Sequence, residues 1–389
     1  MIYELASSSW GKEEIDAMQR VIKSGMFTMG ENVSKFERKF AQMFGVKYAI
    51  MVNSGSSANL VSLAALSYKK DRPLRPGDEV IVPSISWSTT FYPLQQYGLK
   101  LKFLDVDKDT LNIDVSRLRE ALTPRTKMVV AVSILGNPCE LDVIRKFCDE
   151  NNLYMFEDNC ESMGAELNGR KAGTYGDIGT HSCFFSHHIS TMEGGVIITN
   201  NSEICELSKS LRAHGWTRDL PKNSMIFEED KNDFEGAYRF ILPGYNVRPI
   251  ELSGAIGIEQ LKKLDKMIAV RRENAKIFKE LFQNDDRFIT QKEHGRSSWF
   301  AFTMILNPKL SVERKEIFKV LKAENIGHRM ITGGNFLRHE VIKFFDYECV
   351  GDTPNANLAH DYGFFVGNHP RDLSDELSRL HEVLQRYLK

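Results

Sequence analysis

Cysteine is scarce in this chain and nowhere clustered. The 389 residues include six cysteines without a Cys-x-x-Cys pair: Cys139, Cys148, Cys160, Cys183, Cys205 and Cys349. In a chain of this length, that spacing predicts reduced thiols and a cytoplasmic protein rather than a disulfide framework. It also excludes the tight cysteine cluster that an iron–sulfur centre needs, and we predict no metal site.

Long apolar runs and an excess of charge of either sign are also missing. No uninterrupted apolar run approaches ~18–20 residues, so no membrane span is predicted. The first residues, Met1–Leu5, lack the basic region and apolar run of a signal peptide. The formal charge of -1 gives no electrostatic case for nucleic acid or for an anionic membrane. An anionic ligand therefore needs a local site.

The chain does contain a repeated alternation of strand-like and helical stretches. Short, mainly apolar runs predict buried strands at Tyr48–Val52, Glu79–Pro83, Leu101–Val106, Lys127–Val132, Leu153–Asp158 and Val196–Thr199. Such strands, separated by helical stretches, are typical of an α/β fold with a mostly parallel sheet that is covered on both faces.

The pattern changes after Pro249. We predict helices at Glu251–Leu264, Ile268–Phe282, Val312–Asn325 and Asp375–Leu388, and a strand at Trp299–Leu306. This mixture predicts a large ligand-binding domain over residues 1–249 and a smaller C-terminal α+β domain over residues 250–389.

Two short elements in the first part of the chain could bind a phosphorylated aromatic ligand. The turn Ser54–Ser57 follows a strand and opens a helix, where free N–H groups can cradle a phosphate or the turn can simply cap the helix. Trp87 lies among small polar residues after the second strand. Its indole can stack on a heteroaromatic ring or pack as an ordinary apolar side chain.

Two further elements extend this set. Asp158 ends a strand, at the edge where ligands bind in parallel sheets, and can pair with a protonated pyridine nitrogen or cap a helix. The loop Ser182–Gly195 carries an aromatic run, then His187 and His188, then a glycine pair. A histidine here is either a structural residue or a base. The order of all four elements favours a fold that binds pyridoxal phosphate (PLP).

The loop resembles that of the nucleotide-sugar aminotransferases, a family of fold-type I (aspartate aminotransferase-like) PLP enzymes. Their loop is similar to Ser-Phe-x-x-x-Lys, followed six residues later by Glu-Gly-Gly. Counting back six residues from Glu193 reaches His187, so a histidine replaces the lysine that forms the Schiff base. The resemblance therefore implies a noncovalently bound cofactor, as PLP or pyridoxamine phosphate (PMP).

Three blocks of sequence resemble a dehydratase branch of that family: Ser186–Gly195, Arg212–Arg218 and Leu242–Pro249. The resemblance implies removal of the C3 hydroxyl of GDP-4-keto-6-deoxy-D-mannose, on the way to the bacterial polysaccharide sugar colitose. It implies L-glutamate as the amino donor that regenerates PMP. His187 would then act as the base, because an imidazole with a pKa near ~6.5 accepts a proton at neutral pH.

The same resemblance implies further roles by position. The implied cofactor contacts are Gly55, Ser56 and Ser182 at the phosphate, Trp87 on the ring, Asp158 at the ring nitrogen, and Glu161 nearby. Asn246 would reach the cofactor phosphate of a neighbouring subunit, which implies a homodimer with shared sites. The implied contacts of the nucleotide sugar are Met29, His214, Arg218 and Arg329.

Three other functions stay open at this point. An aminotransferase that makes an amino sugar such as GDP-perosamine would need a lysine where His187 stands. An iron–sulfur-dependent 3-dehydrase of CDP-sugars shares the histidine but needs clustered cysteines. A catalytically inactive PLP-fold regulator would have no need of an intact Trp87 and Asp158.

Overall fold

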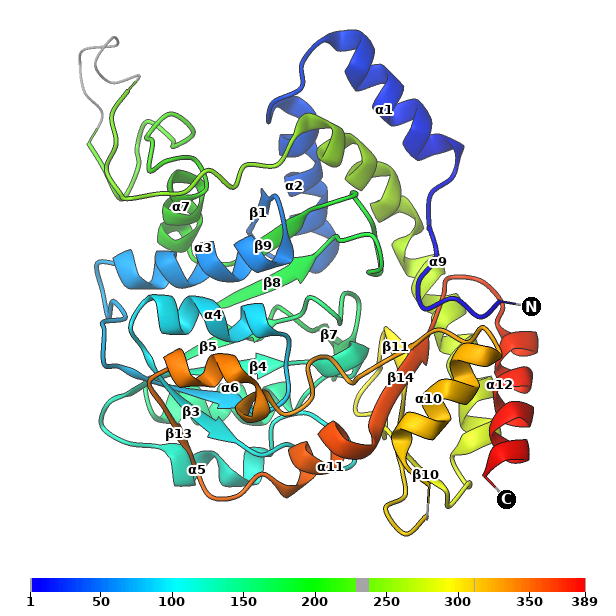
Figure 1. The fold of residues 1–389 in the computed structure, drawn as a ribbon. Coiled ribbons are helices and arrows are strands. Elements are labelled where there is room, and N and C mark those ends of the chain that lie inside the picture. The colour runs from blue at the N-terminus through cyan, green and yellow to red at the C-terminus, as the bar shows by residue number, and fades with distance from the viewer. Residues whose placement is uncertain (1, 229–237, 311, 389) are drawn as a thin grey trace.

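Two main sheets organise the computed structural model, which describes residues 2–228, 238–310 and 312–388 (Figure 1). The larger sheet has the strand order β1-β9-β8-β5-β4-β2-β3-β13. Its strands are β1 (Tyr48–Val52), β2 (Glu79–Pro83), β3 (Lys100–Leu104), β4 (Thr126–Val132), β5 (Tyr154–Asp158), β8 (Ile178–Ser182), β9 (Gly195–Thr199) and β13 (Tyr347–Cys349). Only β9 runs antiparallel to its neighbours in this sheet. The predicted α/β class with a mostly parallel sheet is confirmed.

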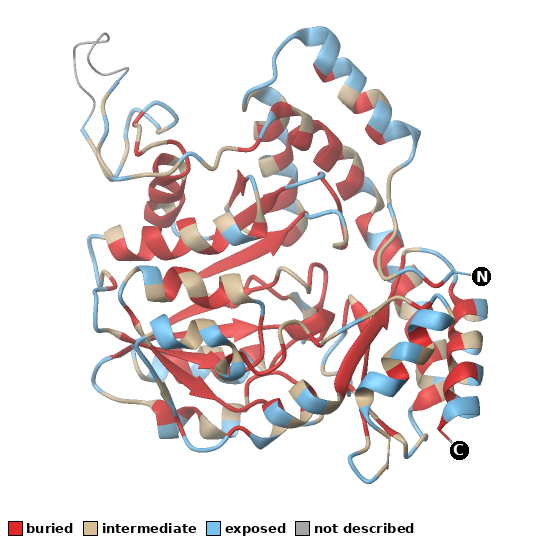
Figure 2. Ribbon diagram, in the orientation of Figure 1, coloured by how far each residue is buried: buried red, intermediate tan, exposed pale blue. Residues whose placement is uncertain are grey.

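Helices cover both faces of the large sheet, because alternate side chains of each strand enter different cores. Val80 and Val82 of β2 pack into the core formed with α3 and α4, whereas Ile81 packs into the core formed with α5 and α6. Figure 2 shows the inner strands of this sheet as mostly buried, whereas the edge strand β13 is largely exposed. The covering helices are α3 (Gly55–Tyr68), α4 (Ser88–Gln96), α5 (Leu118–Ala121), α6 (Leu141–Glu150) and α7 (Ser202–Leu211).

A third group of helices lies beside β1 and β9. It consists of α1 (Lys12–Ser24), α2 (Glu31–Phe44) and α9 (Glu251–Phe282). Helices α2 and α9 pack on the strands, and α1 packs on α9. The prediction of two helices over 251–264 and 268–282 is wrong, since α9 is one helix of 32 residues. Its buried stripe continues through Leu264, Met267 and Ile268, and neither glycine nor proline interrupts it there.

The smaller sheet is antiparallel and lies beside the large one (Figure 1). Its strands, in order, are β10 (Phe288–Thr290), β11 (Ala301–Leu306), β14 (Gly363–Gly367) and β12 (His328–Arg329). Its core also takes side chains from α9, from α10 (Arg314–Ala323) and α12 (Ser374–Tyr387), and from Tyr3 near the start of the chain. Because β13 joins the large sheet from this part of the chain, the chain crosses between the two sheets more than once. The domain boundary at Pro249 stays a prediction.

The remaining elements are short. They are β6 (Glu166–Leu167), β7 (Arg170–Lys171), α11 (Pro354–Tyr362) and the 3-10 turns η1 (Val115–Arg117), η2 (Ile134–Gly136), η3 (Phe336–Arg338) and η4 (Glu340–Phe344). Among the described residues, no helix has both the length and the apolar character that crossing a membrane requires.

Candidate active site

The turn between β1 and α3 has the form of an anion cradle. The Ser54 hydroxyl accepts the Ser57 N–H at 3.0 Å, and the Ser54 carbonyl accepts the Ala58 N–H at 3.0 Å. The N–H groups of Gly55 and Ser56 have no partner among the described residues. A phosphate fits here, because the positive end of the helix dipole adds to these two free donors.

Gly55 lies close to the end of β8. A Cβ added to Gly55 would lie 2.7 Å from the Ser182 Cβ and 2.9 Å from the Cys160 Sγ, so any larger residue would push these elements apart. The glycine therefore brings the first turn of α3 next to Ser182, whose Oγ accepts the Phe184 N–H at 3.3 Å. Gly55, Ser56 and Ser182, predicted at the phosphate, come together in the structure.

Asp158, at the end of β5, is buried and firmly held. Its Oδ2 accepts hydrogen bonds from the Asn59 amide at 2.9 Å and from the Thr90 hydroxyl at 2.7 Å, and its Oδ1 accepts the Cys160 N–H at 3.1 Å. The Thr180 hydroxyl in turn donates to the Asn59 Oδ1 at 2.6 Å. No helix begins after Asp158, so the helix-cap alternative is wrong. The carboxylate fits a partner such as a protonated ring nitrogen.

Trp87 stands immediately before α4 and leaves its indole uncovered, with 56% of the residue exposed. That exposure rules out the core-packing alternative. The helix that follows is linked to the phosphate cradle, because the Ser56 hydroxyl donates to the Thr89 Oγ1 at 2.9 Å. An uncovered aromatic side chain close to the cradle fits a stacking role.

Glu161 lies three residues after Asp158 and is partly buried. Burial raises the pKa of Glu161 to about 7, the Asp158 charge adds to this, and a hydrogen bond from the Leu135 N–H opposes it. That N–H reaches the Glu161 Oε2 at 3.0 Å. Leu135 has a φ of 50°, a strained value for a residue with a side chain. A carboxyl group with this pKa carries its proton part of the time near neutral pH and can then donate a hydrogen bond.

Replacing Glu161 by Gln should change how stability depends on pH. The pKa of Glu161 is higher in the folded protein than in the unfolded chain, so its stabilising contribution is present below about pH 4.5 and lost as the pH rises through 7. Glutamine does not titrate, so the variant does not lose stability in this way as the pH rises. We expect Glu161→Gln to gain about 2 kcal/mol in unfolding free energy relative to wild type between pH 5 and pH 8. Denaturant unfolding of the two cofactor-free proteins at several pH values measures this difference. If the unfolding free energies of wild type and Glu161→Gln change with pH in parallel, the prediction is contradicted.

The loop between β8 and β9 places its two histidines differently. His188 is buried, and its Nε2–H donates to the Ser298 carbonyl at 3.1 Å, as a structural residue does. His187 is partly exposed, and its ring lies edge-on to Phe300, with ring centres 5.1 Å apart. Burial and, second to it, the charge of Arg271 lower the pKa of His187 below its usual value. At neutral pH its imidazole is therefore uncharged and can accept a proton.

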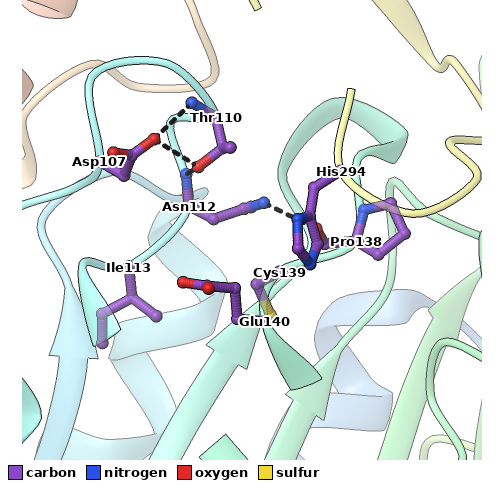
Figure 3. Close-up of a pocket in the computed structure, with 8 residues that line it drawn as sticks. All are labelled: Asp107, Thr110, Asn112, Ile113, Pro138, Cys139, Glu140 and His294. Atoms are coloured by element: carbon purple, nitrogen blue, oxygen red, sulfur yellow. Dashed lines mark hydrogen bonds between the residues drawn. The ribbon is translucent and has the colours of Figure 1, made fainter. Parts of the chain in front are cut away.

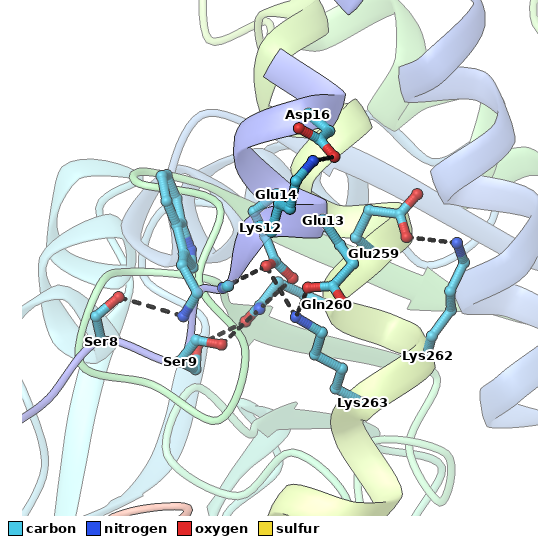
Figure 4. A network of polar contacts seen from close by, with 12 residues as sticks. Ser8, Ser9, Lys12, Glu13, Glu14, Asp16, Glu259, Gln260, Lys262 and Lys263 are labelled. Atoms are coloured by element: carbon cyan, nitrogen blue, oxygen red, sulfur yellow. Dashed lines mark hydrogen bonds and ion pairs between the residues drawn. The ribbon is translucent and has the colours of Figure 1, made fainter. Parts of the chain in front are cut away.

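A polar network around Gln260 and Glu14, shown in Figure 4, also reaches Ser190 of this loop. The Ser190 N–H donates to the Gln260 Oε1 at 3.0 Å, and the Trp10 indole N–H donates to the Ser190 carbonyl at 3.0 Å. Gln260 also donates to the buried carboxylate of Glu14 at 2.8 Å, and Lys263 pairs with Glu14 at 2.9 Å. The histidine loop is thus attached to the rest of the protein at two residues, His188 and Ser190.

Three other predicted residues form a second group around Trp216. The His214 ring lies 5.0 Å from the Trp216 ring, and the Arg218 guanidinium lies 5.9 Å from its centre. Asn246 forms an isolated bridge with Ala213, beside His214, and its side chain is exposed. The structure therefore brings His214, Arg218 and Asn246 together on one surface.

Met29 and Arg329 belong to neither group. Met29 packs partly against the core that α2 and α9 share, and Arg329 is exposed in β12, at the edge of the small sheet. Their contact with a nucleotide sugar stays a prediction. Sequence reasoning missed Asn59, Thr90 and Thr180 around Asp158, because these three come from different elements and have no shared motif.

A hollow of about 170 Å³ lies elsewhere (Figure 3). Its lining includes Asp107, Asn112, Glu140 and His294, and none of the predicted site residues. Among the described residues, no group of three His, Cys, Asp or Glu side chains is arranged to hold a metal ion.

Comparison with known proteins gives a consistent result. The model of the DegT/DnrJ/EryC1/StrS aminotransferase family matches residues 8–385. A GDP-4-keto-6-deoxy-D-mannose 3-dehydratase of Yersinia pseudotuberculosis is 52% identical over 386 residues, which cover 99% of this chain and 98% of that relative.

Two solved structures of GDP-4-keto-6-deoxymannose-3-dehydratase, or ColD, extend the comparison. One, with a trapped PLP-glutamate geminal diamine, matches with a TM-score of 0.96 and 50% identity, over 100% of both chains. The other is a variant in which adjacent serine and histidine residues are replaced by asparagine and lysine. It matches with a TM-score of 0.95 and 50% identity, over 97% of this chain and 100% of that one.

Proposed function

This chain belongs to the DegT/DnrJ/EryC1/StrS aminotransferase family, and from that premise we propose that it is a PLP/PMP-dependent sugar 3-dehydratase. The family resemblance predicted from the loop is confirmed, as is the PLP cofactor class. The proposed reaction removes the C3 hydroxyl of GDP-4-keto-6-deoxy-D-mannose and gives GDP-4-keto-3,6-dideoxy-D-mannose. The observation that carries the proposal is His187, standing in the lysine position of an otherwise complete cofactor site.

Different residues of the site would bind different parts of the cofactor. Gly55, Ser56 and Ser182 would bind its phosphate, Trp87 would cover its ring, and Asp158 would pair with its ring nitrogen. When bound, the cofactor supplies the amine that links to the sugar and the ring that takes up electrons. Asp158, buried among Asn59 and Thr90, would place its carboxylate where that ring needs a proton.

His187 would move protons without forming a covalent bond. Its neutral imidazole accepts a proton in the dehydration step, which a protonated imidazole could not do. A lysine in its place would attack the cofactor linkage and release an amino sugar before the hydroxyl is lost. The exchange therefore changes the outcome from amino transfer to removal of oxygen.

The ColD variant supports the choice of His187 over His188. That variant replaces a histidine together with the serine directly before it. In this chain, Ser186-His187 is the one place where histidine follows serine directly. His188 is buried against the Ser298 carbonyl, in keeping with a structural role.

Product analysis tests the proposed function. The protein is incubated with PLP, L-glutamate and GDP-4-keto-6-deoxymannose, and the nucleotide sugars are analysed by mass spectrometry. We expect a product that is one oxygen atom lighter than the substrate, with 2-oxoglutarate and ammonia formed alongside. An aminated sugar would instead support the alternative function, a nucleotide-sugar aminotransferase making a product such as GDP-perosamine.

We also propose a homodimer with shared active sites. Asn246, His214 and Arg218 form a group on the surface, and Asn246 is exposed within its own chain. Trp87 and Phe184 are exposed apolar side chains beside the cofactor residues, as expected of a surface covered by a second copy.

Hybrid dimers test this sharing of sites. Asn246→Ala and His187→Asn should each be inactive alone. Mixed and allowed to exchange subunits, they should regain about one quarter of wild-type activity, because half of the dimers then carry one intact site. Absence of any recovery in dimers that demonstrably exchange would show that each chain completes its own site.

A cytoplasmic location is proposed on the state of the cysteines. All six are free thiols, and Cys139, Cys148, Cys183 and Cys205 are buried. Free thiols in this number are typical of a reducing compartment. Fractionation of cells that produce the protein would place it directly.

A further inference from the structure

Arg271 of α9 is a buried cation without an anionic partner. The residue is 4% exposed, and among the described residues no carboxylate forms an ion pair with it. Its Nη1 donates to the Phe300 carbonyl at 3.2 Å and to the Asn368 carbonyl, and its Nε–H has no partner. Burying an unpaired charge costs several kcal/mol, so retaining one points to a specific use.

Phe300 connects this cation to the active site. Its ring lies edge-on to His187, with ring centres 5.1 Å apart, and also contacts His188 at 5.8 Å. Its N–H donates to the Leu135 carbonyl at 3.0 Å, and the Leu135 N–H holds Glu161. The Phe300 backbone therefore lies between Arg271 on one side and the turn that holds Glu161 on the other.

Two more contacts fix the segment that carries Phe300. His188 donates from Nε2 to the Ser298 carbonyl at 3.1 Å, which joins the histidine loop to the residues before β11. The Asn368 side chain donates to the carbonyls of Arg271 and Trp299 at 3.1 and 2.8 Å. The wall behind His187 is thus built from residues that follow Pro249, far away in the sequence.

We propose that Arg271 is a positioning residue for His187: through the Phe300 carbonyl it fixes the aromatic wall against the imidazole, and it is the fixed positive charge behind that wall. This inference rests on the proposed function of His187 as the base. Removing the arginine should therefore both loosen the wall and make His187 easier to protonate.

Few charged or titratable groups face the two imidazoles. The pKa of His187 is lowered by burial and then by Arg271. The pKa of His188 is lowered by burial and then by Arg271, with smaller effects from His187 and from His181 of β8. His369, after β14, also lies within range of Arg271. Of these groups, only Arg271 is a fixed cation, so it is the one to remove.

The test combines a titration with kinetics on two Arg271 variants. In the cofactor-free protein, NMR follows the His187 ring signal, identified by its loss in His187→Asn. Arg271→Met should raise the His187 titration midpoint by about one pH unit, since a nearby like charge shifts a pKa by that order. Arg271→Met should also shift the acid limb of the pH profile of kcat/KM for the GDP-sugar to higher pH. Arg271→Lys keeps the positive charge, so the His187 titration midpoint should return to its wild-type value. Its kcat should stay below that of wild type.

Arg272→Met is the matched control. Arg272 is the next residue on α9 and also donates to carbonyls, to Ser297 at 2.9 Å and Gly164 at 3.2 Å, but among the described residues it forms no hydrogen bond with Phe300. Its replacement should leave the His187 midpoint unchanged. Equal midpoints in wild type, Arg271→Met and Arg272→Met would overturn the electrostatic part of the proposal.

Phe300→Leu tests the wall itself and remains informative if Arg271→Met fails to fold. Leucine keeps both backbone hydrogen bonds and removes the ring, so kcat should fall about tenfold while KM for the GDP-sugar changes little. Wild-type kcat in Phe300→Leu would overturn the positioning part. Because the NMR titration needs no turnover, a protein without dehydratase activity would refute the proposed function and leave the Arg271 titration result readable.

Discussion

His187→Lys should abolish dehydration almost completely and give the protein a covalently attached cofactor. The lysine amine would occupy the place of the imidazole and form a Schiff base with PLP, as a primary amine does and a histidine cannot. Loss of a positioned base costs about 10²–10⁴-fold in rate, so we expect at most about one per cent of wild-type dehydration.

His187→Asn is the companion variant for this prediction. Asparagine removes the base without supplying an amine, so dehydration should also be lost while the cofactor stays noncovalent. Absorbance spectra and mass spectra of the denatured proteins distinguish the two variants, and sugar products are measured by mass spectrometry. Full dehydratase turnover in His187→Lys would falsify the assigned role of His187.

Asp158→Asn should have the second largest effect. The amide oxygen can still accept the two hydrogen bonds that reach Oδ2, from Asn59 and Thr90, but the amide nitrogen cannot accept the Cys160 N–H. The substitution also removes the carboxylate that we propose pairs with the protonated ring nitrogen. Without that charge the ring takes up electrons poorly, and we expect kcat to fall at least about a hundredfold. Unlike His187→Asn, this variant should also slow the half-reaction with L-glutamate.

Asp177→Asn is the control for this second prediction. Asp177 is a partly buried carboxylate next to the same sheet, where it pairs with Arg145 at 3.0 Å and accepts the Met155 N–H at 2.8 Å. Its loss should lower the melting temperature with little effect on the half-reaction. If Asp158→Asn and Asp177→Asn affect the half-reaction equally, the proposed role of Asp158 does not hold.

Local sequence was enough to predict most of the strands that carry the site. The apolar runs at Tyr48–Val52 and Glu79–Pro83 are observed as β1 and β2 with the same bounds, because burial on both faces leaves a strong composition signal. Strand β8 was missed, since Ile178 is the one large apolar residue of Ile178–Ser182 and the others are Gly, Thr, His and Ser. Thr180 donates to Asn59 and Ser182 lies beside the cradle, whereas the His181 ring packs against Phe40 and Phe44.

Contacts between residues far apart in the sequence limit how much of the site can be predicted. The six-residue count to Glu193 identified the position of His187 from the loop alone. Nothing local indicated that Phe300 and Arg271 would lie behind it, because these residues are 113 and 84 positions away and have no shared motif. Burial and, second to it, the Arg271 charge lower the pKa of His187, so the sequence predicts the base but not the surroundings that keep it neutral.

The most direct test of the account follows the nitrogen of the amino donor. The wild-type protein is supplied with PLP, GDP-4-keto-6-deoxymannose and L-glutamate labelled with ¹⁵N. If His187 directs the reaction to dehydration, the label should leave as ammonium and the deoxygenated sugar should contain none. Label retained in the nucleotide sugar at the level of turnover would contradict the account and identify an aminotransferase.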